Sequence, residues 1–511
     1  YSSPEKQGIP SSALLSFIEA IEREHIELHS FILMRHRHIV AEGYWAPFDP
    51  HQPHRLFSAG KAVVALAILF AIQEQRLSLE DRVADLLPDK MPEHPSDRLK
   101  RLNLYHLLTM HTGHDKDPFA AMLQPGVDRA RVFFEQALVY EPGTHFLYNN
   151  GVPDILGIIL HRLTGESVFD YLAPRVFEPL GMTGMTVMKN GELDELPTMA
   201  FRSRDFFKLT LLFAEGGRWE GKPLLDERLV RDACSYLVPS LQRPEPPYAA
   251  YDTKFGYGYQ IWRNSVGGFR LDGGRGQFGI VVPEMDIVAV INANEPDQSI
   301  IPVLFWKHVT NRLYARPIHE DDEVLEQQQR LREKLGSLTW HPAMKGGDKD
   351  KGTVANFQRR YTFHEAFCGC RNLHIEVREG GKEIILQTDR HGKTIRAQLA
   401  ADRWSPCTVP FAVPEIVEAK QKIRLDLVAG ADPEQAVGAY CRPDAHTLEV
   451  HFRSAAWMGA HVFRMVFHES GLTITYEPGT SYNMRHRSDI TPRGLREQWI
   501  TAGVEGAASL V

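Results

Sequence analysis

The most uniformly apolar part of the chain is residues 62–72, Ala-Val-Val-Ala-Leu-Ala-Ile-Leu-Phe-Ala-Ile. A helix formed by this stretch has no polar face, so we expect it in the centre of a domain. The run is also shorter than the roughly 20 residues that a membrane-spanning helix needs. The pattern therefore predicts a buried core helix, which continues to about residue 75.

The first 318 residues alternate between helix-like and strand-like patterns. Apolar residues at helical spacing predict helices at residues 11–24, 102–113, 152–163 and 203–215. Short apolar runs bounded by turn residues predict strands at residues 30–34, 38–45, 257–262, 269–271, 279–282 and 287–292. We interpret this region as an α/β (α+β) domain in which helices flank an antiparallel sheet.

The pattern changes after residue 318. A charged helix is predicted at 319–335, and it leads into Lys345-Gly-Gly-Asp-Lys-Asp-Lys-Gly352, a stretch that has no apolar residues with which to pack a core. From residue 353 onward, alternating runs predict only strands, at residues 373–377, 383–387, 394–399, 447–452, 461–467 and 472–476. We therefore expect three parts: a domain at 1–318, a charged helix and linker at 319–352, and an all-β barrel or sandwich at 353–511.

Composition narrows the classes of function. The 511 residues are 43% apolar and 24% charged, as in globular proteins of more than one domain, and the net charge of -7 argues against nucleic acid or an anionic membrane as the main partner. Five cysteines are few and odd in number, so we expect thiols rather than disulfides and a cytoplasmic location. The chain opens at Tyr1 without a recognisable leader.

The first candidate for chemistry stands at the head of the core helix. Ser58 and Lys61 are three residues apart, which places them on one helical face. Burial lowers the pKa of a lysine, and a neutral amine beside a serine hydroxyl can remove its proton. The alternative interpretation is a helix cap beside a lysine whose ammonium group reaches solvent.

Two further segments follow Ser58-Ala-Gly-Lys61 in order: Tyr148-Asn-Asn150 and the glycine-rich turn Leu271-Asp-Gly-Gly-Arg-Gly-Gln277. Together the three resemble the motifs of the serine β-lactamase and penicillin-binding-protein superfamily. The closest likeness is to its class C-like branch of esterases, peptidases and amide hydrolases. The resemblance spans about residues 9–312, and further matching segments lie at residues 107–113, 141–143, 177–182 and 214–224.

The resemblance implies a role for each motif residue. Ser58 is implied as the nucleophile that becomes acylated, and Lys61 and Tyr148 together as the groups that move its proton. Asn150 is implied to hold Lys61 and the substrate amide. The backbone N–H groups of Ser58 and Arg275 are implied as donors to the oxyanion.

The third motif departs from the family pattern. Relatives usually carry Lys or His, then a small residue, then Gly, whereas this chain has Asp272, Gly273 and Gly274. The cation that meets a substrate carboxylate is therefore replaced by an acid, which predicts weak or absent activity on β-lactams. Either the Arg275 side chain restores the positive charge from the same turn or it points to solvent. Gly273 is expected to permit close approach of the backbone.

The predicted function is a serine hydrolase for a small ester or amide, without a cofactor. One alternative is a penicillin-binding or sensing module that is acylated without efficient turnover, and another is a peptidase for D-amino-acid substrates. His106, His111 and His114 lack the spacing of metal ligands, so no metal is predicted. Tyr257 and Trp262 either line an acyl pocket or pack in the core. The oligomeric state stays open.

Overall fold

The computed structural model describes residues 1–190, 193–194, 196–240, 253–295, 297–340, 356–390, 392–401, 403–412, 435–444, 446–454, 460–480 and 504–510. The chain forms two compact units. Unit 1 comprises Tyr1–Gly43 and Pro50–Gly336, and unit 2 comprises Tyr44–Asp49 and Ser337–Val511. The short segment 44–49 is held in unit 2 by the Ala46 N–H, which donates to the Leu338 carbonyl across 3.0 Å. The boundaries at 318 and 353 stay predictions.

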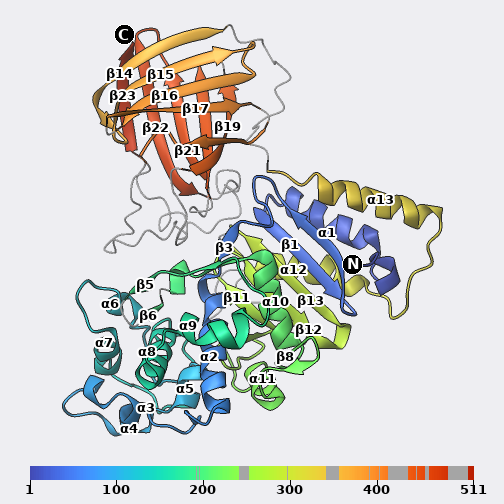
Figure 1. Ribbon diagram of the computed structural model, residues 1–511, viewed down its shortest axis with the longest axis vertical. Helices are drawn as coiled ribbons and strands as arrows, with labels where there is room; N and C mark the ends of the chain where they lie inside the picture. Colours follow the sequence, from blue (N-terminus) through green and yellow to red (C-terminus); the bar gives the residue numbers. More distant parts are fainter. Residues whose placement is uncertain are drawn as a thin grey trace. The chain divides into compact units, whose positions relative to one another are not determined.

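Unit 1 is built on a six-stranded sheet with the order β10-β11-β12-β13-β1-β2. Its strands are β1 (Leu28–Arg35), β2 (His38–Tyr44), β10 (Trp262–Arg263), β11 (Phe269–Gly273), β12 (Gln277–Val282) and β13 (Ile287–Ala293). Strand β1 pairs antiparallel with β13, so segments about 260 residues apart lie side by side (Figure 1). The predicted antiparallel sheet is confirmed.

Helices cover both faces of this sheet because β1 alternates between them. Phe31 packs against Phe17 of α1 (Ser11–Arg23) and Phe305 of α12 (Ile300–His308), with ring centroids 5.2 and 6.2 Å away. Its neighbour Ser30 points to the opposite face, where its hydroxyl lies 2.7 Å from that of Ser203 in α10 (Ser203–Ala214). The period of two in a strand thus sets which helix lies on each face.

The other helices gather around α2 (Lys61–Gln73). They are α3 (Val83–Leu86), α4 (Asp97–Arg101), α5 (Leu104–Leu108), α6 (Phe119–Met122), α7 (Arg129–Glu135), α8 (Val152–Thr164) and α9 (Val168–Leu172). Helix α11 (Glu227–Ala233) follows α10 along the chain, and α13 (Asp322–Gly336), at the end of unit 1, packs against α1. Single turns occur at Glu5–Gln7, Phe57–Gly60 (η2), Pro88–Lys90, Ala173–Phe177, Leu196–Thr198, Pro283–Met285 and Thr310–Arg312. Small strands are β3 (Pro53–Arg55), β4 (Met185–Thr186), β5 (Lys189–Asn190), β6 (Leu193–Asp194), β7 (Ala200–Arg202), β8 (Arg218–Trp219) and β9 (Lys222–Pro223).

Helix α2 is the core helix that the sequence predicts. Every residue from Lys61 to Ala71 is buried, and the helix contacts α8 and α9 (Figure 1). No helix among the described residues is long and apolar enough to cross a membrane. The buried faces of α2 stabilise the unit through the removal of apolar surface from water.

We expect the Ile68→Ala substitution to lower the free energy of unfolding by about 2–5 kcal/mol, because it leaves a cavity around a fully buried position. The matched control is Glu19→Ala on the exposed face of α1, which we expect to change stability by less than about 0.5 kcal/mol. Urea unfolding followed by circular dichroism measures both values. An equal effect of the two substitutions would contradict the central position of α2.

Unit 2 contains a ten-stranded sheet with the order β17-β16-β15-β14-β23-β22-β21-β20-β19-β18, all of whose ladders are antiparallel. Its strands are β14 (Phe357–Phe367), β15 (Cys370–Arg378), β16 (Glu383–Arg390), β17 (Lys393–Ala400), β18 (Ser405–Thr408), β19 (Gln435–Asp444), β20 (Thr447–Arg453), β21 (Ala460–Phe467), β22 (Gly471–Thr480) and β23 (Val504–Leu510). The prediction of a β-rich C-terminal part is confirmed. Across the described residues no ladder joins edge strands β17 and β18, so the sheet is not a closed barrel.

Some predicted elements differ from the structure. The strand predicted at 257–262 is wrong for most of its length, because only Trp262 belongs to a strand. Gln260 has φ +61° and its side-chain amide donates to the carbonyls of Leu107 and Leu108, so this segment serves the helical cluster instead. Strands β14, β18, β19 and β23 were not predicted. The linker predicted at 345–352 lies outside the described residues.

All five cysteines lie in the described part of the chain, and none of them forms a disulfide. The expectation of thiols is therefore confirmed. Cys368 and Cys370 flank the turn between β14 and β15, where Cys368 has φ +46° and Gly369 has φ +76°. The pair thus marks a tight hairpin.

Candidate active site

Ser58 lies in a tight turn between the core helix α2 and the sheet of unit 1. The turn η2 (Phe57–Gly60) runs directly into α2, and Phe57 has φ +47°, an unusual conformation for a bulky residue. Strand β11 passes close by: a Cβ added to Gly273 would lie 2.0 Å from the Leu56 carbonyl oxygen and 3.0 Å from the Ala59 nitrogen. A glycine at 273 therefore allows the sheet edge to approach the backbone beside Ser58, as the sequence predicts.

Lys61 is buried and contacts two of the predicted site residues. Its Nζ donates to Ser58 Oγ across 2.9 Å and to Asn150 Oδ1 across 2.8 Å. The residue is only 2% exposed, and this burial lowers the pKa of Lys61 to about 8. The carboxylates of Asp117, Asp154 and Asp272 act in the opposite direction and limit the shift.

Tyr148 completes the group. Its hydroxyl is hydrogen-bonded to the Ser58 side chain, and Lys61 Nζ lies 4.7 Å from the centroid of its ring. Burial raises the pKa of Tyr148 far above its usual range, so the hydroxyl keeps its proton at neutral pH. The hydroxyl of Ser58, the amine of Lys61 and the phenol of Tyr148 are thus brought together.

An aromatic wall fixes the orientation of the Tyr148 ring. Trp262 stacks on it with centroids 5.4 Å apart, and Tyr257 meets its edge with centroids 6.3 Å apart. Both rings are buried, at 7% and 0% exposed. The sequence left open whether Tyr257 and Trp262 line a pocket or pack in the core, and the structure places them in the core beside the candidate nucleophile.

Asp117 is a member of the site that the sequence analysis did not identify. Its carboxylate accepts from the Asn150 side-chain amide across 2.7 Å and from the Asn150 backbone N–H across 3.2 Å. These two bonds direct the Asn150 carbonyl oxygen toward Lys61. Asp117 also stands first among the carboxylates that raise the pKa of Lys61. A single Asp in a polar loop carries no pattern that distinguishes it from other loop residues.

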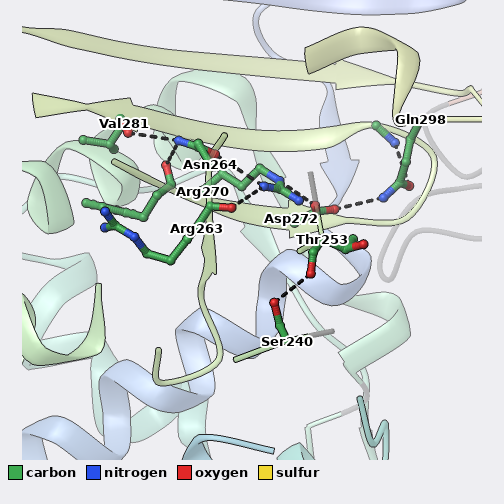
Figure 2. Close-up of polar contacts among 10 residues, drawn as sticks. Ser240, Thr253, Arg263, Asn264, Arg270, Asp272, Val281 and Gln298 are labelled. Atoms are coloured by element: carbon green, nitrogen blue, oxygen red, sulfur yellow. Dashed lines mark hydrogen bonds and ion pairs between the residues drawn. The ribbon is translucent and has the colours of Figure 1, made fainter. Parts of the chain in front are cut away.

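The third motif lies at the end of β11, where Asp272 is held by two partners. The buried Arg270 side chain donates through Nε to Asp272 Oδ2 across 2.7 Å, and Gln298 donates to Oδ1 across 2.9 Å. Figure 2 shows these two side chains reaching Asp272 from opposite sides. Arg270 and Asp272 are 2% and 10% exposed, so the pair is an ion pair largely removed from water. The sequence analysis did not identify Arg270.

The turn after Asp272 consists of Gly274, Arg275 and Gly276, between the paired residues Gly273 and Gln277. Arg275 has φ +63° and Gly276 has φ +90°. The Arg275 guanidinium donates to Asn294 Oδ1 across 2.7 Å. The Arg275 side chain thus contacts the end of the neighbouring strand through Nη1, and the two alternatives from the sequence, a cation directed to the substrate or a solvated arginine, stay predictions.

The three histidines considered as metal ligands make local contacts instead. His106 forms a capping box with Asn103 at the start of α5. His111 Nδ1 lies 2.9 Å from the Thr109 carbonyl oxygen, and His114 Nδ1 lies 2.8 Å from the Thr112 hydroxyl. These contacts account for the burial of His111 and His114 in the helical cluster.

The sequence of this chain is similar to a known protein family and to individual known proteins. A model of the Beta-lactamase family matches residues 17–299, more than half of the chain. A lovastatin esterase from Penicillium rubens is 28% identical over 151 residues, which cover 25% of this chain and 38% of that protein. Protein flp from Staphylococcus aureus (strain COL) is 28% identical over 140 residues, covering 26% and 28%. The chain thus spans well under two thirds of these curated relatives.

A solved structure extends the comparison over a larger part of the chain. The octameric penicillin-binding protein homologue from Pyrococcus abyssi is 16% identical, with a TM-score of 0.45, and the match covers 90% of this chain and 97% of that one. The family match over residues 17–299 contains both Ser58 and Tyr148. The chain therefore belongs to the Beta-lactamase family.

Proposed function

We propose that this protein hydrolyses a small ester or amide through an acyl-enzyme formed on Ser58. The observation that carries the proposal is the contact of 2.9 Å between Ser58 Oγ and the Nζ of Lys61, a lysine whose pKa is lowered to about 8 by burial. A general base works best when its pKa lies near the operating pH. Lys61 meets that condition, whereas Tyr148, whose pKa is raised by burial, holds its proton.

These differences in pKa assign the proton transfers. Neutral Lys61 takes the Oγ proton while Oγ attacks the carbonyl carbon, which gives a tetrahedral oxyanion. Tyr148 donates its hydroxyl proton to the departing alcohol or amine as the bond to the carbonyl carbon breaks, and the proton gained by Lys61 then restores Tyr148. Water attacks the acyl group and gives its proton to the Lys61–Tyr148 pair, and Ser58 Oγ leaves with that proton.

The oxyanion requires donors that are in place before the reaction. We assign this role to the backbone N–H groups of Ser58 and Arg275. Support comes from the close approach of Gly273 to the Leu56 carbonyl and the Ala59 nitrogen, which brings the third motif next to η2. A Cβ added to Gly274 would lie 3.7 Å from Phe57 Cγ, so the turn that carries Arg275 begins beside the same residue.

The third motif indicates the charge of the substrate. Asp272 occupies the position where relatives carry a cation, and Arg270 neutralises it within the protein. The remaining cation of the motif, Arg275, donates to Asn294 Oδ1 across 2.7 Å, so the position of Asp272 itself offers no positive charge to a carboxylate. We infer a neutral substrate, and the name of the lovastatin esterase relative favours an ester among the possible acyl compounds.

The test combines a covalent probe with turnover. A fluorophosphonate should add one equivalent to the protein, and peptide mass spectrometry should place the adduct on Ser58. A chromogenic short-chain ester should show sustained release of the alcohol beyond one equivalent. A burst of one equivalent followed by arrest would favour the penicillin-binding or sensing alternative, and the absence of any adduct on Ser58 would refute the proposal.

We expect Asp272→Asn to improve the use of substrates that carry a carboxylate near the scissile bond. Removing one negative charge should raise kcat/KM for such an ester relative to its neutral analogue by roughly fivefold, which corresponds to ~1 kcal/mol of Coulomb energy at contact distance in water. The same change should lower the pKa of Lys61, since the Asp272 charge raises it. Steady-state kinetics on matched acid and amide substrates measure the ratio.

The matched control for this charge change is Asp286→Asn, at a side chain that is 68% exposed. We expect that control to leave the ratio of kcat/KM values unchanged. An unaltered ratio in Asp272→Asn, with the melting temperature showing a folded protein, would mean that Asp272 does not face the substrate.

A further inference from the structure

A second group of reactive side chains lies in unit 2, on neighbouring strands β19 and β20. Cys441 of β19 is paired directly with Glu449 of β20, and His451 follows two residues later on the same face as Glu449. The Cys441 thiol donates to Glu449 Oε2 across 3.9 Å and lies 3.9 Å from His451 Nε2. His451 Nε2 and Glu449 Oε2 are 3.7 Å apart. A thiol, a carboxylate and an imidazole therefore lie within 4 Å of one another.

The group is buried on a strand that has no solvent-facing side. One face of β20 carries Leu448, Val450 and Phe452, which belong to the hydrophobic core of unit 2. On the opposite face, Glu449 and His451 are 7% and 2% exposed, and Cys441 is 8% exposed. Burial of a carboxylate and an imidazole costs free energy unless they are compensated by partners or by a metal.

The geometry distinguishes a metal site from a catalytic relay. In a Cys-His-acid relay the acid contacts one ring nitrogen and the sulfur the other. Here Cys441 Sγ and Glu449 Oε2 both approach the same atom, His451 Nε2. The second oxygen of Glu449 points elsewhere, toward Arg464 Nη1 at 3.8 Å. The three atoms converge as ligands do and are not arranged in a chain.

The separations are close to those of a tetrahedral ion. Zinc bonds of about 2.3 Å to sulfur and about 2.0 Å to nitrogen or oxygen set the ligand atoms about 3.3–3.6 Å apart. The three separations here, 3.7, 3.9 and 3.9 Å, need to contract by only a few tenths of an ångström. A thiolate, an imidazole and a carboxylate together are a ligand set that zinc accepts.

We propose that Cys441, Glu449 and His451 bind a divalent transition-metal ion of the zinc type, through Sγ, Oε2 and Nε2. The ion replaces the thiol proton, which is released to solvent, and a water molecule or another donor takes the fourth position. The charge balance fits, because the thiolate of Cys441 and the carboxylate of Glu449 together carry the two negative charges that compensate a divalent ion. This site lies in unit 2 and shares no residue with the group around Ser58 in unit 1.

The experiment uses the chain of residues 1–511 with Zn²⁺, and with Co²⁺ as a spectroscopic probe. We expect one Zn²⁺ per chain by isothermal titration calorimetry, and a thiolate-to-cobalt charge-transfer band in the near ultraviolet. X-ray absorption of the zinc-loaded wild type should show one sulfur at about 2.3 Å and nitrogen or oxygen neighbours at about 2.0 Å. This last measurement needs no variant.

Variants assign the ligands. Cys441→Ser and His451→Ala should each weaken Zn²⁺ binding by more than about 100-fold, since even residues outside the ligand set cost 10–100-fold. Cys407→Ser, which removes a partly buried thiol of β18, is the matched control and should keep both the stoichiometry and the cobalt band. Zinc should raise the melting temperature of the wild type and of Cys407→Ser but not of Cys441→Ser.

Two outcomes would overturn the site. One is zinc bound to the wild type with no sulfur neighbour, and the other is equal affinity in the wild type and Cys441→Ser. If Cys407→Ser weakened Zn²⁺ binding as much as Cys441→Ser does, the metal would be bound by thiols outside this group, and the proposed site would be refuted.

Discussion

Replacing Ser58 by alanine is expected to abolish acylation and to lower kcat for a chromogenic ester by a factor on the order of 10³ or more. The variant lacks the oxygen that forms the covalent bond, and neither Lys61 nor Tyr148 offers a substitute nucleophile at that position. Binding of substrate should persist, because the neighbouring strand β11 and its turn are unchanged. Fluorophosphonate labelling and steady-state kinetics measure the two losses.

The matched control is Ser12→Ala, at an exposed serine of α1, which should keep wild-type labelling and kcat. Full ester hydrolysis by Ser58→Ala would place the chemistry elsewhere in the chain. Circular dichroism of the variant should match that of the wild type, which would show that the loss does not arise from unfolding.

Lys61 should impose a pH dependence with an apparent pKa near 8 on kcat/KM. Burial is the main cause of the lowered pKa of Lys61, and only the neutral amine accepts the Ser58 proton. Activity should therefore be low in acid and rise as pH increases through about 8, by about tenfold for each pH unit below that value. A profile of kcat/KM from roughly pH 5.5 to roughly pH 10 tests the sign of this dependence.

Removing the amine should remove this dependence. We expect Lys61→Met to lower kcat/KM by a factor of about 10²–10⁴, the usual contribution of a general base, and to abolish the inflection near pH 8. The melting temperature should not fall, since methionine fills the buried position without an ammonium group to desolvate. Lys100→Met on the exposed face of α4 is the control and should keep the wild-type profile. An inflection retained by Lys61→Met would assign the titration to another group.

The sequence by itself predicted the core helix, most strands of the sheet in unit 1 and the candidate residues of the site. A helix without a polar face can only be buried, and this placed α2 correctly before any contact was known. Alternation and turn residues predicted β1, β2, β11, β12 and β13, because these patterns act over a few neighbouring residues. The order of the three motifs indicated the family, and with it Ser58, Lys61 and Tyr148.

Tertiary structure decided the features that depend on residues distant in the chain. The pKa of Lys61 follows from burial and from Asp117, Asp154 and Asp272, which no spacing connects. Gln298, 26 residues further along the chain, donates to Asp272 Oδ1, a contact that no local pattern predicts. Convergence of Cys441, Glu449 and His451 likewise requires the register of β19 against β20. Local patterns fix helices and strands, but electrostatics and ligand geometry depend on which chain segments meet in space.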